Sequence, residues 1–218
     1  MDYKKFCDIL NKHIFVSEKK ELITKIADSP ERFIGLFRPT KPKGKILQYL
    51  LQSNEIKMGD ALEEIIECFL KEELNFDILE KELEYRTNNK TKKLSIDLHF
   101  KKGEDFYFVE LKIRDDHDST KKIGQFSNFK KKFELLLKKH SPNRLFGIMY
   151  FIDPQFKKNK RYYEEKLSEL GTEFAAKNYN FAFYIFYGKE FFEHFSKEEK
   201  IWDNIIQWIK TWKENIPE

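Results

Sequence analysis

Apolar residues recur along the chain with two periods, and the period predicts where helices and strands lie. From Tyr3 to about Ala27 the apolar positions fall at helical spacing, which predicts one or two amphipathic helices. A more regular helix is expected to begin at Gly59-Asp60, and its apolar face consists of Ala61, Leu62, Ile65, Ile66, Phe69 and Leu70. The first part of the chain is therefore predicted to be a helical lead-in.

A basic, proline-containing segment interrupts this helical pattern. Residues Phe37 to Lys45 include two prolines and a glycine, which disfavour a continuous helix, and four cations. We expect a basic loop here, followed by a short helix from Ile46 to Gln52. The four cations of the loop are Arg38, Lys41, Lys43 and Lys45.

Three strand candidates follow, at roughly Phe76 to Tyr85, Leu94 to Lys101 and Phe106 to Ile113. Turn residues at Asn88-Asn89 and at Gly103 separate them, which indicates a meander. The pattern then predicts, in order, a helix from about Gln125 to Lys139, a strand Leu145 to Ile152, a helix from about Tyr162 to Lys177, a strand Phe181 to Tyr187 and a C-terminal helical region.

This order of elements predicts an α/β (α+β) fold, in which helices flank a mixed central β-sheet. With 218 residues, of which 40% are hydrophobic, the chain is long enough to bury one sizeable core. Residues 1–58 are expected to form the lead-in, residues 59–190 the core and residues 191–218 a C-terminal helical region, with the lead-in part of the same domain as the core.

Charge and cysteine content narrow the class of protein. The formal net charge is only +4, but the cations are clustered, which matters more for a polyanionic partner than the total does. Cys7 and Cys68 lie in apolar helical contexts without metal-ligand spacing, so no disulfide framework is expected. The pattern shows no secretory signal and no apolar run long enough to cross a bilayer. We therefore expect a cytoplasmic protein with no membrane partner.

Two acids and a lysine interrupt the apolar pattern of the second and third predicted strands. From Leu94 to Phe100 the apolar residues share one parity, so Asp97 is expected on the opposite, polar face together with His99. Glu110 and Lys112 are two residues apart and project together from the end of an apolar strand. If the two strands form a hairpin, both carboxylates converge on one cation beside Lys112. The alternative is a surface salt bridge at the end of a strand, and His99 is expected to be structural or to contact phosphate.

This pattern resembles the PD-(D/E)XK nuclease superfamily, whose signature is an acid on one strand and Glu/Asp-x-Lys on the next. Asp97 and Glu110-Leu111-Lys112 match it, and Ile96 replaces the proline that often precedes the first acid. The predicted element order from Gly59 to Ile152 is also similar to the superfamily's restriction-endonuclease-like core. The combination carries the resemblance, because Glu-x-Lys alone also occurs at Glu18/Lys20, Glu55/Lys57, Glu164/Lys166 and Glu198/Lys200.

The resemblance implies Mg²⁺-dependent hydrolysis of phosphodiester bonds. It assigns Asp97, Glu110 and the main-chain carbonyl of Leu111 to the metal. Lys112 would either orient or deprotonate the attacking water, or stabilise charge on the phosphate, and the sequence does not separate these roles. The family often adds an acid from the helix before the sheet, for which Glu63 is the candidate. The alternative for Glu63 is a place on a solvated helix face.

The clustered cations point to double-stranded DNA as the partner. Besides those of the basic loop, cations lie around the predicted hairpin turn and would line a phosphate-binding cleft: Arg86, Lys90, Lys92 and Lys93. For each cluster the alternative is a solvated surface. The segment of about residues 30 to 70 also resembles, less specifically, the lead-in of some small restriction endonucleases, including those that cut GGNCC.

The chain is longer than a minimal nuclease core and contains no helicase, ATPase or methyltransferase motif, so no nucleotide cofactor is expected. A type II restriction endonuclease that cuts a specific short sequence is the best reading. Because each chain has one active site, we expect a homodimer to cut both strands. Two alternatives are a repair or recombination nuclease that recognises DNA structure and a non-catalytic DNA-binding module on a degenerate nuclease fold.

Overall fold

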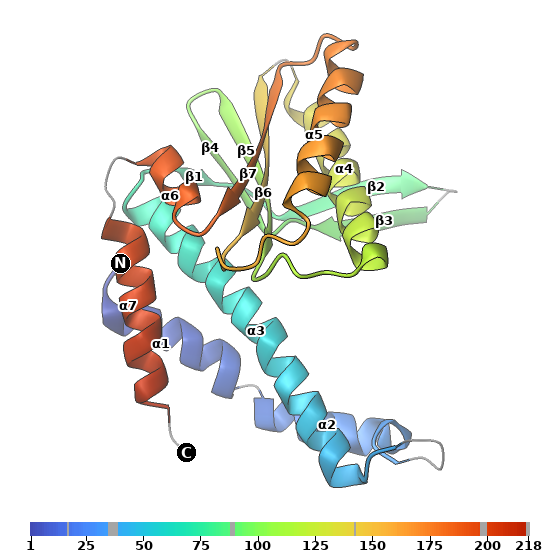
Figure 1. Ribbon diagram of the computed structural model, residues 1–218, viewed down its shortest axis with the longest axis vertical. Coiled ribbons are helices and arrows are strands. Elements are labelled where there is room, and N and C mark those ends of the chain that lie inside the picture. The colour runs from blue at the N-terminus through green and yellow to red at the C-terminus, as the bar shows by residue number, and fades with distance from the viewer. Residues whose placement is uncertain (17, 35–38, 88–89, 142, 197–199, 217–218) are drawn as a thin grey trace. The chain divides into compact units, whose positions relative to one another are not determined.

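A computed structural model describes residues 1–16, 18–34, 39–87, 90–141, 143–196 and 200–216 of the chain (Figure 1). These residues form two compact units. The first consists of Met1–Cys68 and Lys210–Glu218, and the second of Phe69–Ile209. Among the described residues, none of the helices combines the length and apolar character that a membrane span requires. The second unit contains every strand of the described chain and is the candidate nuclease core.

The first unit is helical, as the sequence predicts. It contains α1 (Tyr3–Asn11), a π-helical turn (Lys12–Val16), α2 (Glu18–Asp28), a short 3₁₀ turn (Pro30–Arg32), most of α3 (Pro42–Glu72) and the end of α7 (Lys200–Glu214). Asp2 caps α1, because its carboxylate accepts a hydrogen bond from the backbone N–H of Lys5 at 2.8 Å. The buried face of α1 and the following turn consists of Phe6, Ile9, Leu10 and Ile14.

Helix α3 corrects the predicted loop. It runs without a break from Pro42 to Glu72, so Lys43 and Lys45 are helical and no second helix begins at Gly59. Pro42 is tolerated because it is the first helical residue, where a backbone N–H has no partner within the helix. Each glycine inside a helix costs about 1 kcal/mol relative to alanine, which lowers stability without ending the helix. Phe37 and Arg38 lie outside the described residues.

The second unit is built on a five-stranded mixed sheet, which confirms the predicted fold class. Its strand order is β1-β4-β5-β6-β7, with β1 (Asp77–Ile78), β4 (Leu98–Lys102), β5 (Asp105–Lys112), β6 (Arg144–Phe151) and β7 (Phe181–Tyr187). The pairs β1–β4 and β4–β5 are antiparallel, whereas β5–β6 and β6–β7 are parallel. Almost every residue of β6 is buried, as expected for a central strand that is covered on both faces.

Two helices connect the parallel strands and cover one face of the sheet. Helix α4 (Ser119–His140) links β5 to β6, and α5 (Lys160–Ala175) links β6 to β7. They lie side by side (Figure 1) and share a hydrophobic core with the sheet, which includes Phe133 of α4, Leu167 of α5 and Met149 of β6. On the other face, the short helix α6 (Glu190–Phe195) packs Phe191 against Tyr150, with ring centroids 4.4 Å apart.

The predicted three-stranded meander is wrong in one respect, because its first two strands each divide in two. Their inner parts are β1 and β4 of the main sheet, whereas their outer parts, β2 (Glu82–Thr87) and β3 (Lys90–Ser95), pair as a separate two-stranded ribbon. Ile78 pairs with Phe100 in the main sheet, and Glu82 pairs with Ser95 in the ribbon. Along the first arm, Glu82 is four residues after Ile78, whereas along the second arm Phe100 is five residues after Ser95. The second arm therefore contains one extra residue at the bend around Asp97. An extra residue of this kind re-aims a side chain, as a β-bulge does.

Candidate active site

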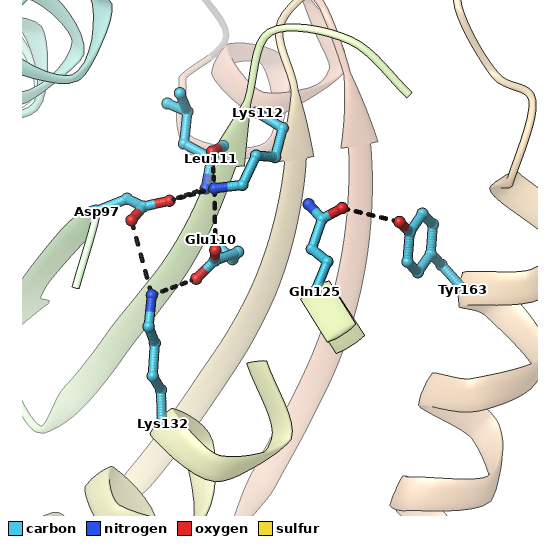
Figure 2. A network of polar contacts seen from close by, with 7 residues as sticks. All are labelled: Asp97, Glu110, Leu111, Lys112, Gln125, Lys132 and Tyr163. Atoms are coloured by element: carbon cyan, nitrogen blue, oxygen red, sulfur yellow. Dashed lines mark hydrogen bonds and ion pairs between the residues drawn. The ribbon is translucent and has the colours of Figure 1, made fainter. Parts of the chain in front are cut away.

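Asp97, Glu110 and Lys112 meet at the end of β5, as the sequence predicts (Figure 2). The Lys112 ammonium lies 3.1 Å from Asp97 Oδ2 and 2.9 Å from Glu110 Oε1. Asp97 Oδ2 also accepts a hydrogen bond from the backbone N–H of Leu111 at 2.8 Å. The bend between β3 and β4 thus turns Asp97 toward β5, although the regular alternation assumed for residues 95–99 is interrupted there.

The cluster is largely removed from water. The side chains of Glu110, Asp97 and Lys112 are 6%, 14% and 33% exposed, respectively. Burial lowers the pKa of Lys112, but the charges and hydrogen bonds of Glu110 and Asp97 outweigh it, and the net pKa is raised. Lys112 is therefore an ammonium ion within this cluster, and a simple surface salt bridge does not describe the site.

Three oxygens converge on the Lys112 ammonium. They are the carbonyl oxygen of Leu111 at 2.7 Å, Glu110 Oε1 at 2.9 Å and Asp97 Oδ2 at 3.1 Å. These are the three groups to which the superfamily resemblance assigns a metal ion. They fit a hard divalent cation, because carboxylate and carbonyl oxygens are its usual ligands and here already surround a positive charge. Within the described part of the chain, no three His, Cys, Asp or Glu side chains form a metal cluster, so the fit depends on the backbone carbonyl.

Lys132 is a member of the cluster that the sequence analysis missed. It lies in a run of three lysines, which is typical of a solvated helix face, yet its side chain is only 9% exposed. Its ammonium lies 2.6 Å from Glu110 Oε2 and 3.7 Å from Asp97 Oδ1. The helical period of α4 could have identified it, because it places Lys132 on the same buried face as Gln125, Phe129, Phe133 and Leu136.

Gln125 lies on the same face of α4, two helical turns before Lys132. Its amide oxygen accepts a hydrogen bond from the Tyr163 hydroxyl at 2.9 Å, whereas its amide nitrogen is buried without a partner. Figure 2 shows this nitrogen on the side of Gln125 that faces away from Tyr163. A buried donor without a partner is unusual in proteins, and Gln125 adds such a polar group to this face of the helix.

His99 has a structural environment. It is buried, and its ring nitrogens lie 2.8 Å from the carbonyl oxygen of Glu80 and 3.1 Å from Nε2 of His140. Burial lowers the pKa of both histidines, to about 4 for His140. Both rings are therefore neutral near pH 7, and His99 ties the start of β4 to the end of α4.

The remaining predicted site residues lie outside this cluster. Glu63 is partly buried on α3, in the first unit. The predicted DNA-contacting residues Lys41, Lys43 and Lys45 also belong to this unit: Lys41 is exposed and directly precedes α3, Lys43 is exposed in its first turn, and Lys45 is partly buried. Lys45 donates a hydrogen bond to Gln48 at 2.9 Å. The ribbon of the second unit carries the exposed cations Arg86, Lys90, Lys92 and Lys93.

Of the ribbon cations, Lys93 is paired with Glu82 at 2.7 Å and with Glu84 at 3.7 Å. Its charge is therefore partly balanced within the ribbon. Arg38, the remaining predicted DNA contact, falls outside the described residues.

A comparison with protein families identifies the chain. The family model described as type II restriction endonuclease, HinfI, matches residues 2–82 and 71–213. The protein is thus a restriction endonuclease, a hydrolase that acts on DNA. More particularly, it belongs to the HinfI family of type II, site-specific deoxyribonucleases. No curated protein and no solved structure matches the chain.

Family membership favours the type II restriction enzyme over the repair nuclease and the non-catalytic module. The family description names no recognition sequence, so the resemblance to enzymes that cut GGNCC stays a prediction.

Proposed function

We propose that this enzyme hydrolyses phosphodiester bonds of double-stranded DNA at a specific short sequence, and that it does so with Mg²⁺ held by Asp97, Glu110 and the carbonyl of Leu111. The observation that supports this assignment is the convergence of these three oxygens on one cationic group, within 2.7 to 3.1 Å. When bound, Mg²⁺ supplies positive charge to the phosphate and activates water for attack.

Each residue of the cluster has a separate task in this proposal. Glu110 and Asp97 carry two negative charges at a largely buried position, where a cation is needed to balance them. The backbone N–H of Leu111 fixes the orientation of Asp97. Lys112 is the most exposed of these side chains and extends on a flexible stem, so we assign it to the phosphate, where its ammonium stabilises added negative charge.

DNA binding and assembly belong to the same proposal. We assign phosphate contacts to the cations predicted between residues 38 and 45 and to those of the ribbon, and the role of an additional acid to Glu63. Because one chain contributes one active site, a symmetric dimer would cut both strands of a palindromic or nearly palindromic site. Glu63→Gln is expected to reduce cleavage without abolishing folding.

The experiment is digestion of unmethylated phage DNA with Mg²⁺, beside an EDTA control. Asp97→Asn, Glu110→Gln and Lys112→Ala are each expected to abolish cleavage while they leave folding largely intact. Glu164→Gln and Lys166→Ala are matched controls, because these residues form another Glu-x-Lys pair on α5, and both variants should cut like the wild type.

Each outcome of the digestion has a definite meaning. Discrete fragments from the wild type and the controls alone would support the proposal and allow the site to be mapped. Full activity in any of the three variants would remove that residue from the active site. Cleavage of branched or single-stranded DNA without discrete fragments from duplex would favour the repair nuclease, and inactivity on all substrates would favour the non-catalytic module.

A further inference from the structure

Lys132 contacts the two acids on the side opposite to Lys112. The Lys112 ammonium pairs with Asp97 Oδ2 and Glu110 Oε1. The Lys132 ammonium pairs with the other two oxygens, Asp97 Oδ1 and Glu110 Oε2. All four carboxylate oxygens therefore have a cationic partner. The two lysines contribute two positive charges against the two negative charges of the acids, so the cluster is balanced without a metal ion.

The place of Lys132 in the fold explains why it stays beside the acids. It lies on the buried face of α4, and Phe133 beside it belongs to the hydrophobic core between α4 and the sheet. Its side chain is 9% exposed, compared with 33% for Lys112. A buried ammonium is stable only with a close counter-charge, and Glu110 at 2.6 Å supplies it. The Lys112 side chain is thus more accessible to solvent than that of Lys132.

We propose that Lys132 is a positioning residue that acts as a tethered counter-cation. It holds Glu110 Oε2 and Asp97 Oδ1 on one side of the acid pair, so that Glu110 Oε1 and Asp97 Oδ2 face the three-oxygen position occupied here by Lys112. This inference rests on the proposed function, because it assumes that a divalent cation takes that position. Two effects follow: the acids stay assembled without metal, and the fixed charge of Lys132 weakens metal binding.

Metal binding without DNA tests the proposal. Titration calorimetry with MgCl₂, and separately with CaCl₂, compares the full-length wild type with Lys132→Met. Because removal of a positive charge a few ångströms from a divalent cation strengthens its attraction to the acids, the dissociation constant of the variant should fall at least about tenfold. Lys130→Met is the matched control, since Lys130 is on the same helix but pairs with Glu173 at the surface, and its dissociation constant should not change.

Thermal unfolding separates positioning from simple packing. In EDTA, Lys132→Met leaves two buried acids short of a counter-charge, so its midpoint should fall by about 6 °C or more. Saturating MgCl₂ should recover most of that loss, because the metal replaces the missing charge. Lys132→Arg, which keeps the charge, should resemble the wild type in both measurements, and Lys132→Gln provides a second neutral variant if the methionine variant does not fold.

Two results would overturn the role of Lys132. An unchanged midpoint in EDTA would show that the acids do not need its charge. A lowered midpoint that metal does not restore, with an unchanged dissociation constant, would make it an ordinary structural lysine. These measurements involve no DNA, so a failure of Lys132 in them is distinguishable from a failure of the proposed cleavage, which the phage DNA digestion reports.

Discussion

A methyl group at Gly147 would collide with the helix that carries Lys132. Gly147 lies in β6, and a Cβ atom built there lies 2.8 Å from two ring carbons of Phe133 in α4 and 2.9 Å from a ring carbon of Phe183 in β7. Contacts this short force side chains or backbone to shift, and overpacking of a core costs about 1–3 kcal/mol. For a chain of this size, Gly147→Ala should therefore lower the unfolding midpoint by about 2 to 12 °C.

Two assays follow this perturbation to the active site. Thermal unfolding in EDTA measures the loss of stability. The rate of DNA cleavage below the midpoint measures whether α4 has moved, because Lys132 directly precedes Phe133. A displaced α4 lengthens the Lys132–Glu110 contact, so the rate should fall as well.

The matched control is Gly124→Ala in α4, the helix that carries Phe133 and Lys132. A Cβ atom there meets nothing within 4 Å, and alanine in a helix is favoured over glycine by up to about 1 kcal/mol. The control should be as stable as the wild type or slightly more stable. If Gly147→Ala were as stable as the wild type, close packing of Phe133 on Gly147 would not be what fixes the height of α4 above the sheet.

Two further predictions concern pH and salt. Burial, with smaller contributions from the charges of His99 and Lys139, lowers the pKa of His140 to about 4, whereas an unfolded histidine has a pKa of about 6.5. The unfolded state therefore binds more protons between these values, and the stability from neutral His140 is complete above pH 6.5 and lost as the pH falls toward 4. The unfolding midpoint should drop from pH 7.5 to pH 5 in the wild type and drop less in His140→Phe; equal drops would contradict this cause. If Lys92 contacts a DNA phosphate, Lys92→Ala should weaken binding and reduce the slope of log affinity against log salt by about one, whereas an unchanged slope would place Lys92 away from the backbone.

Local patterns were sufficient for much of the fold. The strand from Phe181 to Tyr187 has the bounds predicted for it, because a short aromatic run between turn residues has few alternatives to a strand. Glu110 and Lys112 point to the same side of β5 because alternation within one strand is a local property. The long helix α3 was not predicted as one element, since its proline and two glycines are typical of a loop, whereas the proline is the first helical residue and the cost of the glycines is outweighed along the helix.

The residue pattern alone was enough to identify two acids and a lysine on neighbouring strands, because residue types and their spacing within a strand are local properties. Their arrangement around one position follows from the packing of the whole sheet. The extra residue near Asp97 appears only when the pairing of both arms is known, because an insertion in one strand has meaning only relative to its partner. Lys132 lies in α4, 22 residues after Glu110 in the chain, and contacts the acids from there. A charged residue on an apolar helix face has an identifiable partner only once that face is packed against the sheet.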